Sequence, residues 1–331
     1  MSNDILPLGP GDSGDAVRDL QRRLGDAGFP VNDRPGEFGG ATSEAVRRFQ
    51  VSRGLEPDGD VGHQTWNALI EAAFRLGDRL LYLRSPMYRG DDVASLQSRL
   101  GSLGFNAGRV DGVFGPDTAG AVEEFQRNIA VTADAVVGPE TLAALSRVSG
   151  HSSGQSVAAV LEAESLRFDP PELAGARIVI GDFGGAAALV GACARLLSRH
   201  GAVVTTVSGD DATEHAEVAN EFRAIAYLGI SIHETPACRA LYFSTEGYES
   251  IGGRQLARRL ARECGVVLDT SHTCEGMRLP VLRATRMPAV VCRVGPPEAV
   301  VRSLGDLADS VARSVEEWVV APLEGQGPHE P

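Results

Sequence analysis

The chain is poor in positive charge and has no long apolar run. Its 331 residues include 31 basic and 44 acidic side chains, and none of the basic ones is a lysine. The formal net charge of −13 argues against a nucleic-acid partner, because phosphate binding needs a basic face. No stretch approaches the roughly 20 apolar residues that span a bilayer, and the start MSNDILPLGPGDSGD lacks the features of a secretory signal. We therefore expect no membrane span and a cytoplasmic location.

Cysteine is scarce and irregularly spaced. No pair has the C-x-x-C spacing of common zinc and redox motifs. An odd number of cysteines without a regular pattern is more typical of buried thiols in a reducing compartment than of a disulfide framework. We therefore predict buried thiols at all five positions: Cys193, Cys238, Cys264, Cys274 and Cys292.

One stretch of the sequence occurs twice. The pattern G-D-x-V-x-x-L-Q-x-x-L-x-x-x-G-F begins at Gly14 and again at Gly90, an offset of 76 residues. So many identities at one fixed offset indicate an internal repeat. The same offset relates further identical residues: Phe38 and Phe114, Thr42 and Thr118, Phe49-Gln50 and Phe125-Gln126, Gly62 and Gly138, and Thr65 and Thr141.

Each copy is predicted to form three short helices, because apolar residues recur at helical spacing in three places. Asp12 or Ser13, and Asp91 in the second copy, are plausible N-caps, and Gly28 and Gly104 suit the left-handed position after a helix.

The connection between the copies, from Leu76 to Tyr88, is apolar rather than rich in glycine and serine. This composition predicts that the copies form one rigid unit. The run Leu80 to Leu83 is expected to be buried.

The repeated motif resembles the type 1 peptidoglycan-binding domain, a three-helix cell-wall module. The resemblance covers about residues 8–75 and 84–148, and it implies peptidoglycan, its fragments or its precursors as ligand. The motif's Leu, Val, Phe and Gly residues are expected to specify core and turns, so the ligand groove must lie elsewhere on the fold.

The remainder of the chain has a different composition. Residues 149–175 begin with the Ser/Gly-rich SGHSSGQ and are predicted to be a linker with some helical character from Val157 to Arg167, and residues 321–331 a tail. Between them, residues 176–320 alternate β-branched runs with helical patterns, which predicts an α/β sheet covered on both faces. The expected fold class is therefore multidomain, with two all-α three-helix repeats followed by an α/β domain.

The α/β region resembles the zinc-dependent N-acetylmuramoyl-L-alanine amidases of the Amidase_3 type. Ala219-Asn220 and Ile230–His233 match the family's A-N…S-I-H stretch, and residues 279–283 and 287–291 match its V-L-R…P-A-V stretch. The resemblance implies a zinc ion with three protein ligands, an open position for water, and a glutamate that moves the proton.

The catalytic positions depart from that family. Phe183 stands where the first zinc-ligating histidine belongs, and the stretch from Ala186 to Cys193 contains no acid to supply the second ligand. His233 matches the third ligand, and Arg293 stands where the catalytic glutamate belongs. We therefore expect an inactive amidase-like domain with no metal and no cofactor. Two interpretations of Arg293 stay open: it pairs with a carboxylate such as Glu234 or Asp182, or it points to solvent.

A rebuilt metal site is not expected elsewhere, because no H-E-x-x-H or paired-cysteine spacing is present. The side chains that could otherwise contribute to such a site are His200, His215, His272, Glu214, Glu217 and Cys274.

The whole arrangement resembles a family of cytoplasmic proteins with two peptidoglycan-binding repeats and a degenerate amidase domain. The resemblance implies a regulator of peptidoglycan precursor synthesis, with UDP-N-acetylglucosamine enolpyruvyl transferase as partner and a Ser/Thr kinase in control. The resemblance also implies phosphorylation of the tail, but the tail after Trp318 contains no Ser or Thr to accept a phosphate. Two other interpretations stay open: an active zinc amidase with misaligned ligands, and an exported wall-binding protein.

Overall fold

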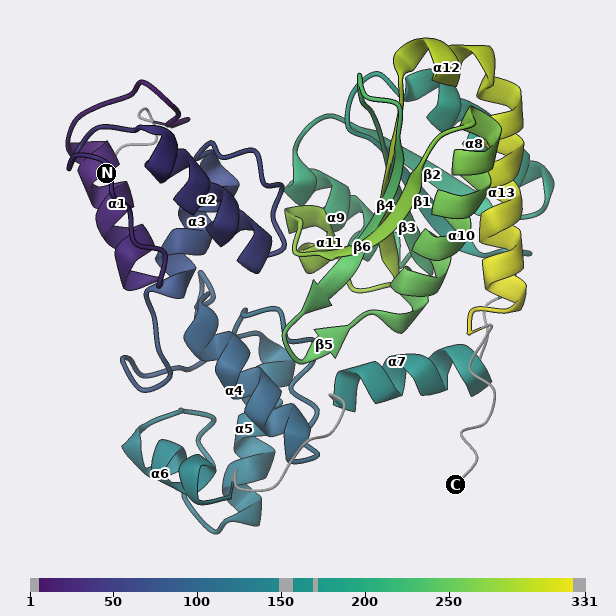
Figure 1. The fold of residues 1–331 in the computed structure, drawn as a ribbon. Helices are drawn as coiled ribbons and strands as arrows, with labels where there is room; N and C mark the ends of the chain where they lie inside the picture. The colour runs from purple at the N-terminus through teal and green to yellow at the C-terminus, as the bar shows by residue number, and fades with distance from the viewer. Residues whose placement is uncertain (1–5, 149–156, 169–171, 324–331) are drawn as a thin grey trace, which may run out of the picture. The chain divides into compact units, whose positions relative to one another are not determined.

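The computed structural model describes residues 6–148, 157–168 and 172–323 (Figure 1). The chain forms two compact units, residues 1–158 with 245–248, and residues 159–244 with 249–331. Of the predicted linker and tail, residues 149–156, 169–171 and 324–331 lie outside the described residues. Within the described ranges no helix is long and apolar enough to cross a membrane.

The first unit contains two sets of three helices, which confirms the predicted repeats. In each set the stripe predicted on the first helix is buried; Val17, Leu20 and Leu24 are 0% exposed. Gly28 and Gly104 follow the first helices with positive φ, as predicted. The helices are α1 (Asp15–Asp26), α2 (Gly40–Ser52), α3 (His63–Ala72), α4 (Asp91–Ser102), α5 (Pro116–Asn128) and α6 (Pro139–Val148).

The N-cap prediction was wrong. The residues at the caps of α1 and α4 are Gly14 and Gly90, and neither has a side chain to accept a hydrogen bond. Asp91 is the first residue of α4, and its carboxylate lies 2.6 Å from the Arg53 guanidinium at the end of α2. Asp91 therefore joins the two repeats by an ion pair instead of capping its own helix.

The connection between the repeats is only partly buried, contrary to expectation. Leu81 is 0% exposed and forms an isolated β-bridge with Val137, whereas Leu80, Tyr82 and Leu83 are 40–53% exposed. Extended backbone turns successive side chains to opposite sides, so an apolar run of this kind need not be buried along its whole length.

Glutamine side chains, three of them buried and Gln21 half-buried, hold the loops of each repeat. In the second repeat, Gln97 Nε2 lies within hydrogen-bonding distance of Asp111 Oδ1 (2.9 Å) and Thr118 Oγ1 (3.1 Å), and its Oε1 accepts from Gly112 N (2.8 Å). Gln126 contacts the loop before α6 in the same way, and Gln21 and Gln50 do so in the first repeat. Each glutamine satisfies backbone groups of a loop that has no other regular structure.

The second unit is an α/β sheet domain, as predicted. The strand order is β2-β1-β3-β7-β4-β5, and β6 pairs with β4. The strands β1, β2, β3 and β7 are parallel, and β4 is antiparallel to β7. The strands are β1 (Arg177–Asp182), β2 (Val203–Ser208), β3 (Ala226–Ile232), β4 (Cys238–Thr245), β5 (Tyr248–Glu249), β6 (His272–Met277) and β7 (Ala289–Val294).

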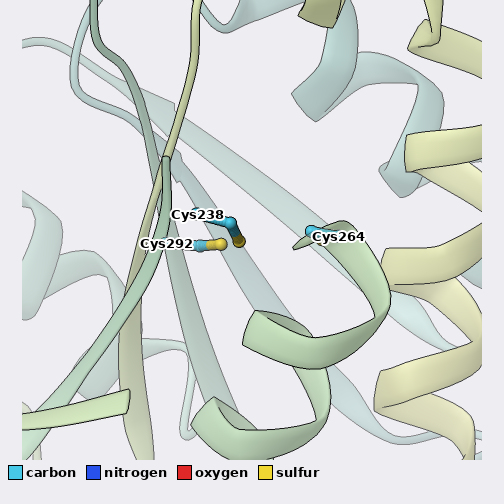
Figure 2. A group of neighbouring side chains, drawn as sticks. All are labelled: Cys238, Cys264 and Cys292. Atoms are coloured by element: carbon cyan, nitrogen blue, oxygen red, sulfur yellow. The ribbon is translucent and has the colours of Figure 1, made fainter. Parts of the chain in front are cut away.

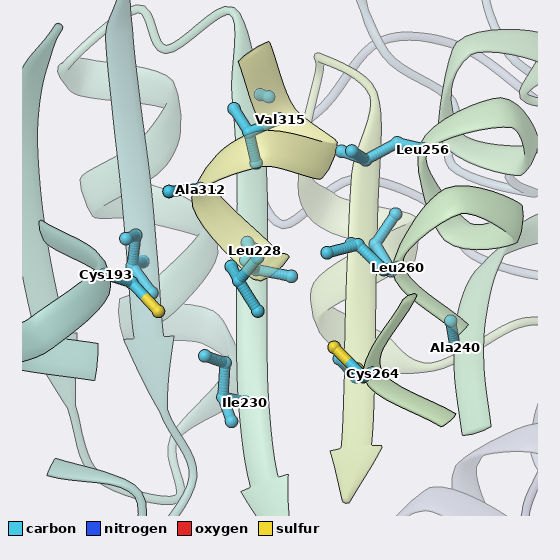
Figure 3. Packing of buried hydrophobic residues seen from close by; sticks show 14 of the residues in the cluster. Cys193, Leu228, Ile230, Ala240, Leu256, Leu260, Cys264, Ala312 and Val315 are labelled. Atoms are coloured by element: carbon cyan, nitrogen blue, oxygen red, sulfur yellow. The ribbon is translucent and has the colours of Figure 1, made fainter. Parts of the chain in front are cut away.

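One face of this sheet carries the main core. Leu228 and Ile230 of β3 pack there against residues such as Leu260 and Val315, which come from α10 and α13 (Figure 3). Trp318 of α13 is fully buried, and its indole N–H donates to Gly252 O at 3.0 Å. The helices of this part of the chain are α7 (Val157–Phe168), α8 (Ala187–Arg199), α9 (Ala212–Glu221), α10 (Ile251–Leu268), α11 (Pro280–Ala284), α12 (Pro297–Arg302) and α13 (Leu304–Val320).

Helix α7 lies in the stretch predicted as linker. Its Ala159 and Leu166 are buried, and the Glu162 carboxylate accepts hydrogen bonds from Ser250 Oγ (2.8 Å) and Gly252 N (3.1 Å). These contacts cap the start of α10, so this part of the predicted linker is a structural element.

Candidate functional site

The carboxyl ends of β1, β3 and β7 meet at one edge of the sheet, because these neighbouring strands are parallel. Phe183 follows β1 directly, His233 follows β3, and Arg293 is near the end of β7. The Phe183 N–H donates to Ile230 O (3.0 Å), and the His233 N–H donates to Val294 O (2.9 Å). The three positions singled out from the sequence therefore lie on adjacent strands, at the edge where open α/β sheets bind ligands.

The ring of Phe183 is packed over the sheet. It stacks on the imidazole of His215, with centroids 4.2 Å apart and an interplanar angle of 16°. A Cβ added at Gly229 would lie 2.7 Å from Phe183 Cε2, and one added at Gly181 would lie 2.3 Å from Tyr227 Oη. Because Gly181 and Gly229 are paired across β1 and β3, the two glycines make room on one sheet face for three rings.

Both ring nitrogens of His215 form hydrogen bonds within this packed cluster. It is 0% exposed, its Nε2 donates to Gly209 O at 2.9 Å, and its Nδ1 accepts from Tyr227 Oη–H at 2.7 Å. Burial lowers the pKa of His215 and raises the pKa of Tyr227. The imidazole is therefore neutral at pH 7, and neither ring nitrogen is left to ligate a metal.

Arg293 lies on the same sheet face as this cluster of rings. It pairs in register with Ser231 on one side and with Arg239 on the other. Arg239 forms a salt bridge with Glu275 of β6 (2.8 Å). The pKa of Glu275 is lowered first by its hydrogen bond with Arg239, and the charge of Arg293 contributes to the same shift. Two guanidinium groups thus stabilise the charged form of one carboxylate, that of Glu275.

Glu275 is not one of the two carboxylates named from the sequence as partners of Arg293, and a pairing of Arg293 with either of those two stays a prediction. Asp182 is buried, and its Oδ1 accepts hydrogen bonds from Gly184 N (2.8 Å) and Ala186 N (3.0 Å). It therefore fixes the loop that carries Phe183. Glu234 is exposed in the loop after His233. Sequence reasoning missed Glu275, because β6 was not recognised as a strand.

The residues at this edge do not fit a catalytic zinc ion. Such an ion takes three protein ligands and keeps a fourth position open. Phe183 has no ligand atom, and the guanidinium group of Arg293 has only hydrogen-bond donors and no lone pair to offer a metal ion. Among the described residues, His233 belongs to no group of three His, Cys, Asp or Glu side chains with ligand atoms within 4.8 Å of one another. Its Nε2 lies 3.2 Å from the hydroxyl of Ser231.

Among the described residues, the other side chains considered for a rebuilt metal site belong to no group of three possible ligands. His200 pairs with Glu316 of α13, His272 lies exposed on β6, and Cys274 is half-buried with its sulfur 3.9 Å from Arg254 O.

Sequence spacing missed one cluster, formed by Cys238, Cys264 and Cys292. Their sulfur atoms all lie within 4.8 Å of one another, and all three side chains are buried (Figure 2). Hydrogen bonds from Cys264 and Cys292 lower the pKa of Cys238, and these contacts with Cys238 raise the pKa of the two donors well above the ordinary thiol value. Only the pairing of β4 with β7 and the path of α10 bring these cysteines together.

The helical repeats match a known family model. Residues 13–69 and 89–145 match the model described as "Putative peptidoglycan binding domain". Among solved structures, the chain is similar to an N-acetylmuramoyl-L-alanine amidase from Clostridium difficile 630, with 16% identity and a TM-score of 0.37, covering 45% of this chain and 99% of that one.

Two curated relatives extend the comparison. The chain is 33% identical over 159 residues to a probable N-acetylmuramoyl-L-alanine amidase of Bacillus licheniformis, covering 43% of this chain and 45% of that protein. It is 37% identical over 294 residues to the N-acetylmuramoyl-L-alanine amidase CwlM of Mycobacterium tuberculosis, covering 78% of this chain and 71% of that protein. With two peptidoglycan-binding repeats ahead of an amidase-related α/β domain, the chain belongs to the family of CwlM.

Proposed function

We propose that this chain binds peptidoglycan fragments or precursors and regulates peptidoglycan synthesis, without hydrolysing the bond between muramic acid and L-alanine. The observation that carries the proposal is the packing of Phe183. Its ring stacks on a buried, neutral His215 at the position where the related zinc amidases need their first ligand.

The charges at the same edge support this proposal. A divalent ion beside His233 would face the guanidinium groups of Arg293 and Arg239, which both act on the carboxylate of Glu275. Repulsion between charges in a partly buried site is worth on the order of several kcal/mol. Arginine also cannot serve as the general base that a hydrolase needs, because a guanidinium group keeps its proton at neutral pH.

The repeats supply the binding half of the proposal. Their cores and glutamine-held loops are complete in both copies, and both match the peptidoglycan-binding family. A protein that binds wall fragments and no longer cleaves them is suited to report the supply of precursors. The proposed partner is UDP-N-acetylglucosamine enolpyruvyl transferase, with a Ser/Thr kinase as the source of control.

Regulation is tested with the purified transferase and the purified full chain. We expect the chain to bind the enzyme in a direct binding assay and to change its rate of enolpyruvyl transfer at saturation, and we expect added muropeptides to alter this effect. A tagged protein of similar size and charge serves as the control. No binding, together with an unchanged rate, would contradict the regulatory proposal.

A further inference from the structure

The three clustered cysteines come from three different elements. Cys238 begins β4, Cys292 lies in β7, and Cys264 lies in the last turns of α10, which covers this face of the sheet (Figure 2). All three belong to the main hydrophobic core and are no more than 2% exposed. They are on the opposite sheet face from Arg293, so a role for them does not depend on the proposed function.

The spacing of the sulfur atoms suits one bound ion. A thiolate–metal bond is about 2.3 Å long, so three sulfurs around one ion in a plane would be about 4.0 Å apart. The three sulfurs already lie within 4.8 Å of one another. Contraction by less than about 1 Å, which side-chain torsions can supply, would bring all three into bonding distance.

The number of donors restricts the kind of ion. Structural zinc sites are almost always four-coordinate. In the part of the chain that the structure describes, the group consists of these three side chains alone, and their burial leaves no exposed position for a water ligand. Soft ions that accept three sulfur donors match the group better, since thiolates select soft metals.

We propose that Cys238, Cys264 and Cys292 form a three-coordinate site for a soft thiophilic ion, of the chemistry shared by Cu(I) and As(III). The two ions differ in the charge they leave in the core. Arsenious acid reacts with three thiols to give a tris-thiolate and three waters; three As–S bonds replace three As–O bonds, and reactants and product are uncharged. Cu(I) displaces one proton to solvent for each sulfur that binds as thiolate, and three thiolates leave a net negative charge.

The site is tested on the reduced full chain, loaded both when folded and during refolding because the sulfurs are buried. Arsenite, Cu(I) and Zn²⁺ are offered separately, and bound ion is counted by mass spectrometry after desalting. We expect one As(III) or one Cu(I) per chain, with zinc failing to remain bound. Binding of one soft ion but not the other identifies which charge state the core accepts.

Substitutions then assign the ligands. Cys264→Ala and Cys292→Ala should each lower the affinity for the ion by at least tenfold, whereas Cys274→Ala, a half-buried thiol outside the group, should leave it unchanged. If a core variant does not fold, X-ray absorption of the loaded wild-type chain measures the ligands directly. We expect three sulfur neighbours around the ion. No binding of either soft ion, binding that survives both substitutions, a shell of two sulfurs, or retained zinc at these cysteines would overturn the proposal.

Discussion

Replacing Gly295 with alanine is expected to destabilise the second unit by more than about 4 kcal/mol, among the largest effects of a single substitution. A Cβ at this position would lie 2.0 Å from His233 O and 2.6 Å from Thr235 O. Both are backbone atoms, so no side-chain rotation relieves the clash. Either the loop after β3 moves away from β7, or the sheet edge opens.

Urea unfolding monitored by circular dichroism measures this effect. Gly305→Ala is the matched control, because a Cβ there meets nothing within 4 Å and Gly305 lies within α13. The control should be neutral, or more stable by up to about 1 kcal/mol. Equal unfolding free energies for the two variants would show that the loop carrying His233 is not fixed by its contact with β7.

Replacing Gln126 with alanine is expected to cost the second repeat about 3–5 kcal/mol, because several partners lose a hydrogen bond at once. Gln126 is 1% exposed; its Nε2 lies near Asp134 Oδ1 (2.9 Å) and Val136 O (3.0 Å), and its Oε1 accepts from Ala135 N (2.9 Å). The loop before α6 would lose the groups that satisfy its backbone, and α6 would lose its anchor.

The same unfolding measurement separates this effect from a general sensitivity to glutamine loss. Gln64→Ala, on the exposed side of α3, should change stability by no more than about 0.5 kcal/mol. A loss below about 1 kcal/mol in Gln126→Ala would mean that the loop is held by other contacts and that the motif glutamine has a different role.

The parts of the fold predicted well are those set by periodic apolar residues. Helical spacing of residues such as Leu20 and Leu96 predicted the helices of the repeats, and β-branched runs predicted the central strands β1 and β3. These signals are local in sequence, because a buried face repeats every few residues. The glutamines of the motif were visible as identities, but their role depends on which loop each side chain reaches.

The parts that were missed depend on pairing between distant segments. The strand β6 is polar, with Thr273 and Glu275 on one face, and only its pairing with β4 makes it a strand. Without it, Glu275 was not considered among the carboxylates that act on Arg293. The cluster of Cys238, Cys264 and Cys292 has no sequence signature for the same reason.

The position of Phe183 shows how far the site could be predicted. The family resemblance placed a phenyl ring where a ligand was expected, and chemistry alone excluded it as a donor. That the ring stacks on His215 above two glycines needed the structure. This packing depends on the register of β1 against β3, which cannot be read from the sequence.

The proposed absence of hydrolysis is tested most directly by incubating the purified full chain with muropeptides and zinc and measuring free stem peptide by mass spectrometry. An active zinc amidase on the same substrate serves as the positive control. Because Phe183 is packed on His215, and Arg293 stands where the family resemblance implies a glutamate, we predict no release above the zinc-only blank. Release that requires zinc and disappears in His233→Ala would contradict this prediction.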